Sequence, residues 1–228
     1  MRGIGALATL ALLGAQVGTA VAEPYLLNLS GNNFSVTEAA AIGQELKVAK
    51  ELSQVQNNPP FALPGILDWS TEYTLYVSGL TLADPPGNPV KNYTGGTIQL
   101  WSQNPPNAPW TPTTPVGSIP AYNPADIPTR LTDGSLLLAG SFTQFATLFF
   151  GGQTGSISAT INWTGGGRLG NLQALGIQNN WHWNGWFNLT APVPPGYQRL
   201  YGGKLEREVP VAVEPATWGA IKNLLRAE

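Results

Sequence analysis

The chain has 228 residues, no Cys and a single His, and only 11% of its residues are charged. The lack of Cys excludes disulfides, thiolate nucleophiles and Cys-ligated zinc, and one His excludes metal sites that need several imidazoles. A formal net charge of -2 without any Lys/Arg cluster argues against nucleic-acid binding. The 27 Gly and 20 Pro predict many turns and an all-β fold.

Residues 1–22 have the features of a secretory signal peptide. Arg2 precedes an apolar stretch over Ile4–Val17, and Ala20-Val21-Ala22 is a small-residue cleavage site. The apolar stretch is shorter than the roughly 20 residues that a membrane span needs. We therefore expect an exported mature chain that begins at residue 23 and has no transmembrane span.

A helix is predicted over about residues 36–55, within an N-terminal segment of residues 23–60. Ser35 and Glu38 have the spacing of a capping box, and the apolar residues that follow recur at helical intervals. Asn57-Asn58-Pro59-Pro60 ends the pattern. We expect the helix to pack on the β domain; a partner-binding helix is the alternative.

Residues 61–209 read as strands separated by turns. The clearest strand is Gly155–Thr164, in which apolar residues alternate with Ser, Thr and Asn. The predicted strands are Thr71–Leu80, Gly96–Ser102, Ser135–Phe142, Gln144–Phe150, Gly155–Thr164, Trp181–Thr190 and Gln198–Val209. Because no helical segment separates them, we expect an antiparallel, jelly-roll-like β-sandwich rather than a parallel sheet.

The segment between Ser102 and Thr132 is rich in Pro and Asn and has almost no periodic hydrophobicity. It is predicted to be a long loop. Such a loop is either functional or an extended cover over a sheet edge, because Pro cannot donate to a β-ladder.

No catalytic residue, metal site or cofactor is predicted. Between Gly134 and Leu205 there is no Asp or Glu, and the G-x-S-x-G nucleophile motif is absent. Gly165–Gly170 lacks the Lys-Ser/Thr of a phosphate-binding loop, and Asp133-Gly134 lacks the acids of a calcium loop. We expect a protein that is not an enzyme.

The segment Trp181–Asn188 carries the candidate ligand-binding face. Strand alternation places Trp181, Trp183 and Phe187 on one face and His182, Asn184, Trp186 and Asn188 on the other. An uncharged face with an indole, amides and an imidazole is typical of a sugar-binding surface, and Trp110 from the Pro-rich loop could extend it. The alternative is that both faces are covered and Trp186 is a core residue. In either case, we expect His182 to be a surface or hydrogen-bonded residue and not a catalyst.

Residues 210–228 form a C-terminal tail with a predicted short helix. Pro215 suits a first helical turn, and Trp218, Ile221 and Leu225 share one face. This helix is far too short to cross a bilayer. It is either a docked terminal helix or a sorting segment.

The tail resembles those of bacterial exported proteins of the PEP-CTERM type. Val213–Thr217 (VEPAT) is similar to the start of that family's tail, and Thr217–Lys222 (TWGAIK) is similar to the T-W-G-x-I-K ending of other secreted bacterial proteins. The blocks Glu72–Leu80, Tyr93–Trp101 and Thr132–Phe142 are similar to the β domains of such proteins. The Pro before Glu214, the apolar span and the Arg cluster of the PEP-CTERM tail are missing. The resemblance implies an exported surface protein without enzymatic activity, with sorting residues Glu214, Pro215, Thr217, Trp218, Gly219, Ile221 and Lys222.

The sequence thus predicts a secreted, non-enzymatic β-sandwich protein of the cell surface or extracellular matrix, with a structural or adhesive role. The alternative is a carbohydrate-binding module that uses the aromatic and amide face around Trp186. Polysaccharide or other envelope components are the expected partners, and exposed sheet edges could support self-association.

Overall fold

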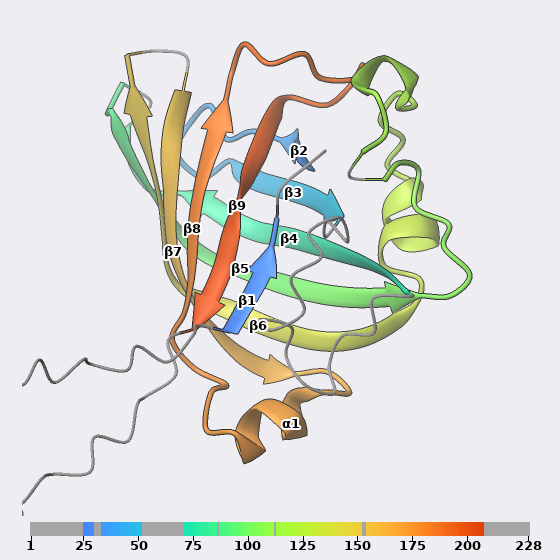
Figure 1. The fold of residues 1–228 in the computed structure, drawn as a ribbon. Helices are drawn as coiled ribbons and strands as arrows, with labels where there is room; N and C mark the ends of the chain where they lie inside the picture. Colours follow the sequence, from blue (N-terminus) through green and yellow to red (C-terminus); the bar gives the residue numbers. More distant parts are fainter. Residues whose placement is uncertain are drawn as a thin grey trace, which may run out of the picture. The chain divides into compact units, whose positions relative to one another are not determined.

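The computed structural model describes residues 25–29, 33–51, 71–85, 87–111, 113–151 and 154–207. Figure 1 shows these residues as a strongly curved antiparallel sheet with few helical turns. The strands are β1 (Tyr25–Asn28), β2 (Asn33–Thr37), β3 (Glu45–Glu51), β4 (Glu72–Leu82), β5 (Val90–Gln103), β6 (Ser135–Phe150), β7 (Thr154–Gly165), β8 (Trp181–Asn188) and β9 (Arg199–Arg207). The helical elements are η2 (Val116–Ser118), η3 (Ile127–Leu131) and α1 (Leu169–Ala174).

The sheet closes on itself, so the predicted β-sandwich is wrong and the all-β fold is a barrel. Among the described residues, strands β2 to β9 pair in sequence order, and β9 pairs with β8 on one edge and with β2 on the other. Phe34 lies opposite Leu200, and Ser35 lies opposite Arg199. Sequence alternation of apolar and polar residues is the same in a sandwich and in a barrel. Closure depends on pairing between the two ends of the sheet, which local patterns do not reveal.

Two strands replace the predicted N-terminal helix. β2 and β3 form a hairpin, and Gly43 adopts the left-handed backbone of its turn, with φ of 83°. In β3 the side chains of Leu46, Val48 and Lys50 are all buried. Every second residue on this face is therefore buried, as in a strand. A hydrophobicity pattern does not show this, because the third of these buried residues, Lys50, is charged. The predicted C-terminal helix lies outside the described residues.

From residue 71 onward, the observed strands lie where the sequence predicted strands. The two segments predicted as Ser135–Phe142 and Gln144–Phe150 are one strand, β6, with a shift in its pairing to β7 between Phe142 and Gln144. This irregularity explains why the alternation is interrupted there.

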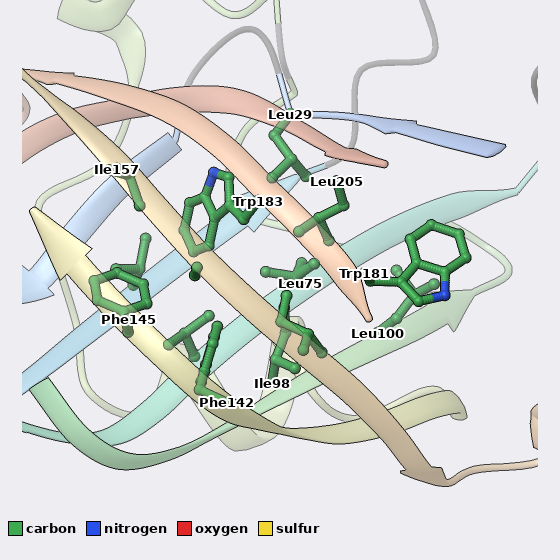
Figure 2. Close-up of a cluster of buried hydrophobic side chains, with 14 of the residues drawn as sticks. Leu29, Leu75, Ile98, Leu100, Phe142, Phe145, Ile157, Trp181, Trp183 and Leu205 are labelled. Carbon is green, nitrogen blue, oxygen red and sulfur yellow. The ribbon is translucent and has the colours of Figure 1, made fainter. Parts of the chain in front are cut away.

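The barrel interior is the main core of the protein. Figure 2 shows side chains from several strands meeting inside it, among them Leu75, Ile98, Phe145 and Trp183. At the end next to α1, the rings of Trp163 and Trp181 pack edge to face, with 6.2 Å between their centroids. Trp181 Nε1 donates a hydrogen bond to the carbonyl of Ile177, 2.6 Å away. This end of the barrel is thus filled by aromatic side chains.

The Pro-rich segment covers the outer wall of the barrel. Its side chains Trp110, Ile119 and Leu131 are buried in a second cluster against β2 and β3. Glu72 on β4 accepts a hydrogen bond from the Ala108 amide at 3.0 Å. Burial raises the pKa of Glu72 more than the backbone hydrogen bonds from Ala108 and Asn107 lower it. The long loop is therefore an ordered cover over the wall.

Candidate functional site

The candidate face lies on the outer wall at β8. Trp181, Trp183 and Phe187 share one face of the strand, as predicted; this face points into the barrel, where all three are fully buried. His182 and Asn184 are exposed, Asn188 is half-buried, and Trp186 is 43% exposed. Ser156 of β7 and Gly202 of β9 lie directly opposite Trp186 in the sheet. Trp186 is thus a wall residue and not part of the core.

The Trp186 indole lies flat on the backbone of β9. A Cβ atom built on Gly202 would sit 2.4 Å from Trp186 Cε2, with Cζ2 at 2.5 Å and Nε1 at 2.7 Å. Nε1 and Cζ2 are the atoms bonded to Cε2 along the outer edge of the indole, and an approach in the ring plane would bring them nearer than Cε2. Because Cε2 is the nearest of the three, the contact is through the ring face. Gly202 makes room for the indole, whose other face is turned away from the strand. An aromatic ring held in this way is a flat apolar platform.

Polar groups beside the platform are connected by short hydrogen bonds. Asn184 Nδ2 donates to Glu206 Oε1 at 2.6 Å, and Lys204 Nζ lies 2.6 Å from Glu206 Oε2. Burial alone would raise the pKa of Glu206, but the hydrogen bonds from Lys204 and Asn184 outweigh it and lower the pKa. The carboxylate therefore fixes the Asn184 amide and the Lys204 ammonium beside Trp186.

Asn188 has a structural part in this region. Its Oδ1 accepts hydrogen bonds from the Thr190 amide at 2.8 Å, the Thr190 hydroxyl at 3.0 Å and the Ala191 amide at 3.0 Å. It therefore holds the turn that follows β8. His182, at the other end of the strand, lies opposite Glu206.

Trp110 is not available to a ligand in this structure. It has 2% of its surface exposed, and its ring centroid lies 5.8 Å from that of Phe34 and 5.4 Å from that of Tyr197. The structure therefore does not bring Trp110 and Trp186 to one open surface. The proposed sorting residues Glu214–Lys222 lie outside the described residues.

Three residues of the face were not singled out from the sequence: Gly202, Lys204 and Glu206. They alternate along β9 at the spacing of residues that share one side of a strand. The sequence signal was present, but only the pairing of β8 with β9 places these side chains beside Trp186 and Asn184.

A second group of polar residues lies inside the barrel and was also missed. It contains Lys50 on β3, Lys91 on β5, and Arg199 and Tyr201 on β9, together with Glu38 from the β2–β3 turn. Arg199 and Glu38 form an ion pair at 3.2 Å, and the Tyr201 hydroxyl donates to Glu38 at 2.9 Å. Isolated charges in apolar strand patterns are the only sequence signal for such a group.

No cluster of three or more His, Asp or Glu side chains suited to a metal ion occurs within the described ranges. The helices of the described part are all too short or too polar to span a membrane. Comparisons find no significant match to any protein-family model, curated protein or solved structure.

Proposed function

We propose that the protein is an exported, non-enzymatic binding protein whose outer wall around Trp186 binds saccharides of the cell envelope or extracellular matrix. The observation that carries the proposal is the Trp186 indole, which lies flat on Gly202 and is 43% exposed. The C–H face of a pyranose stacks on such a ring, and a free aromatic face of this size is costly to leave in water.

The neighbours of Trp186 match the hydroxyl groups of a saccharide. Asn184 and Lys204 are held in place by Glu206, and Ser156 and Ser158 of β7 lie opposite Trp186 and Asn184. Amide, hydroxyl and ammonium groups beside an aromatic platform supply both donors and acceptors. The wall therefore combines one apolar surface with several polar groups, as saccharide recognition requires.

The signal peptide and the tail support a place outside the cytoplasm. Both remain predictions from sequence, since residues 1–22 and 210–228 lie outside the described residues. A saccharide-binding wall on an exported protein would give it an adhesive role, in keeping with the resemblance to PEP-CTERM-type proteins.

The test is retention of the mature chain, residues 23–228, on a panel of insoluble and soluble polysaccharides, with tryptophan emission as a second readout. We expect retention by at least one polysaccharide with a shift in emission. Trp186→Ala should weaken that retention about fivefold or more, because stacking on one aromatic ring contributes on the order of 1 kcal/mol or more. Gly202→Val should weaken it as well, since a branched side chain there displaces the indole.

Trp101→Ala is the matched control, because Trp101 is a half-buried indole on the outer wall at β5. It should leave retention unchanged. Retention that is equal for the native chain and Trp186→Ala, with both proteins folded, would overturn the assignment of the site. Lack of retention on every polysaccharide would leave a structural protein without a saccharide ligand.

A further inference from the structure

The outer wall of the barrel carries exposed apolar side chains besides Trp186. Phe150, at the end of β6, is 55% exposed, and Val90, at the start of β5, is 41% exposed. Leu148 of β6 is half-buried. Proteins rarely leave large apolar side chains grouped on their surface unless these side chains contact another molecule. The position of these three residues relative to Trp186 therefore bears on what the wall binds.

The register of the sheet places Leu148 and Val90 on the same side as Trp186. Trp186 of β8 lies opposite Ser156 of β7, which lies opposite Leu148 of β6. Leu148 in turn lies opposite Val90 of β5. Directly opposite residues of neighbouring antiparallel strands point to the same side of the sheet. These four residues therefore form one row across the outside of the barrel.

Phe150 lies in the next row of the same wall. It is opposite Thr154 of β7, which is opposite Asn188 of β8. Trp186 is two residues from Asn188 along β8, and β7 lies between β6 and β8. With about 4.8 Å between strands and about 3.4 Å per residue along a strand, the backbones of Phe150 and Trp186 are about 12 Å apart. A single sugar ring does not span this distance, whereas a chain of several sugars does.

Side chains with hydroxyl groups lie between the two rings. Ser156 and Thr154 belong to β7, between the strands that carry Trp186 and Phe150. Thr154 is exposed and Ser156 is half-buried. A hydroxyl group both donates and accepts hydrogen bonds, as the hydroxyl groups of sugars do. This wall suits a saccharide chain better than a purely apolar ligand, which would leave the covered hydroxyls without partners.

The described part of the wall offers no unpaired charge. Of Asp, Glu, Lys and Arg, the strands β5 to β8 contain only Lys91. Its Nζ lies 5.0 Å from the centroid of the Phe149 ring, on the inner side of the sheet, where Phe149 packs against the main core. On β9, beside Trp186, the charges of Lys204 and Glu206 form an ion pair. An acidic saccharide would therefore gain little on this wall over a neutral one.

We propose that the ligand of the Trp186 wall is an extended, uncharged polysaccharide, and that a second sugar of the same chain stacks on Phe150. This inference rests on the proposed function. The chain crosses β7 obliquely from Trp186 to Phe150, its hydroxyl groups contact Ser156 and Thr154, and Leu148 adds apolar contact. Two stacking rings on one face bind a chain more tightly than either ring alone, because the second contact is intramolecular once the first has formed.

The first test is calorimetric titration of the mature chain with oligosaccharides of increasing length from cellulose, chitin, laminarin and dextran. We expect affinity to rise with length until the oligosaccharide spans both rings, and then to level off. Phe150→Ala should weaken the long oligosaccharides about fivefold, and retention on the polymers likewise, without weakening the shortest ones that bind. Trp186→Ala should weaken the short and the long ones alike.

Two further variants separate stacking from other effects. Phe150→Tyr keeps the aromatic ring and should keep the native affinity. Leu175→Ala is the matched control, because Leu175 is 47% exposed and ends α1 at the opposite end of the barrel. It should leave every affinity unchanged. A loss of affinity in Leu175→Ala as large as in Phe150→Ala would contradict a specific role for Phe150.

The second test compares neutral polymers with acidic polymers of the same backbone. The pairs are hydroxyethyl cellulose with carboxymethyl cellulose, and dextran with dextran sulfate. We expect the neutral member of a pair to be retained more strongly, with little change between low and high salt, because no ion pair with the ligand is formed. Stronger retention of the acidic member, lost at high salt, would contradict an uncharged ligand.

The outcomes separate this inference from the proposed function. Lack of retention on every polymer overturns the proposed function, and this inference with it. Retention that depends on Trp186 but neither on Phe150 nor on oligosaccharide length overturns this inference alone. Binding to phosphatidylcholine vesicles through Trp186 and Phe150, without retention on any polymer, would show that the wall is a lipid-binding surface and would overturn both.

Discussion

Folding takes the Lys50 amine from water, where it carries a proton, into a barrel interior where no described group hydrogen bonds to it. Burial lowers the pKa of Lys50 well below its ordinary value of 10.5. Between the lowered pKa and 10.5 the unfolded chain binds more protons than the folded chain, so this residue makes stability rise with pH across that interval.

Lys50→Met should therefore stabilise the folded protein at neutral pH. Each tenfold change in proton affinity corresponds to about 1.4 kcal/mol, and 1 kcal/mol raises Tm by about 2–4 °C at this chain length. We expect a rise in Tm of several degrees at pH 7. The difference from the native chain should shrink as the pH approaches 10.5.

Thermal unfolding of both proteins across this pH range measures the effect. Buried tyrosines also respond to alkaline pH: burial, with a smaller contribution from Glu38, raises the pKa of Tyr93 to about 12. Both proteins share this response, so it cancels in their difference. Lys47→Met, which removes an ammonium at the surface of β3, is the control and should not reproduce the gain. A Lys50→Met variant that is less stable at pH 7 would contradict the account.

At the scale of elements, the Pro-rich loop is held to the barrel by a cluster of aromatic residues. Trp110 packs against Phe34 of β2 and Tyr197 of the β8–β9 connection, with angles of 66° and 86° between the ring planes. Thr74 of β4 donates a hydrogen bond to the Leu131 carbonyl, and Arg130 Nε donates to the Asn107 carbonyl at 2.8 Å. The loop thus has its own apolar anchor and its own polar contacts.

Trp110→Ala should weaken this cover strongly. Removing a buried Trp typically costs about 3–5 kcal/mol, because apolar area is lost and a cavity remains. We expect a loss of stability in this range in chemical denaturation, together with faster proteolysis within residues 104–133. Saccharide retention should stay unchanged for the folded fraction, since Trp110 is remote from solvent. A stability within 1 kcal/mol of the native chain would show that the loop is not anchored by Trp110.

Sequence patterns predicted the strands well where apolar and polar residues alternate and the apolar ones are buried. In β7 and β8 buried apolar residues alternate with polar ones, apart from the half-buried Gly165 and Gly185, so both the strands and their faces were predicted. In β3 the buried face reads Leu46, Val48, Lys50, and the lysine breaks the apolar alternation. A helix was predicted there from the capping-box spacing of Ser35 and Glu38 and from apolar residues at helical intervals. Lys50 thus occupies a buried position that a pattern of apolar residues does not predict.

The candidate face could be predicted in part for the same reason. The outward direction of Trp186 and Asn184 follows from alternation along one strand. Only the pairing of β8 with β9 places Gly202, Lys204 and Glu206 beside these two residues. Trp110 lies elsewhere, because the Pro-rich loop packs on another part of the wall. The alternation of residues along one strand predicts which side chains share a face. Which residues lie side by side on neighbouring strands depends on the register of pairing and on barrel closure.

At the scale of the whole molecule, the barrel closes at a narrow seam. β2 and β9 share only two opposite residue pairs, and β1 continues along the same edge of β9 at Lys204–Arg207. Directly after β1, the Leu29 amide donates a hydrogen bond to the Gly203 carbonyl of β9, 2.9 Å away. By contrast, β5 and β6 pair over ten residues of each strand. We therefore expect the barrel to open first along β9.

Leu27→Ala tests this order of opening. Leu27 is fully buried on β1 and lies opposite Leu205, so its truncation should cost about 2–5 kcal/mol and loosen the seam. Hydrogen exchange in low denaturant should show faster exchange of amides in β1 and β9 than in β5 and β6, already in the native chain. In Leu27→Ala the difference should widen. Ile98→Ala, which removes a fully buried side chain from β5, is the matched control and should lower protection throughout the barrel. Equal exchange of all strands, changed equally by both variants, would show that the barrel opens only as a whole.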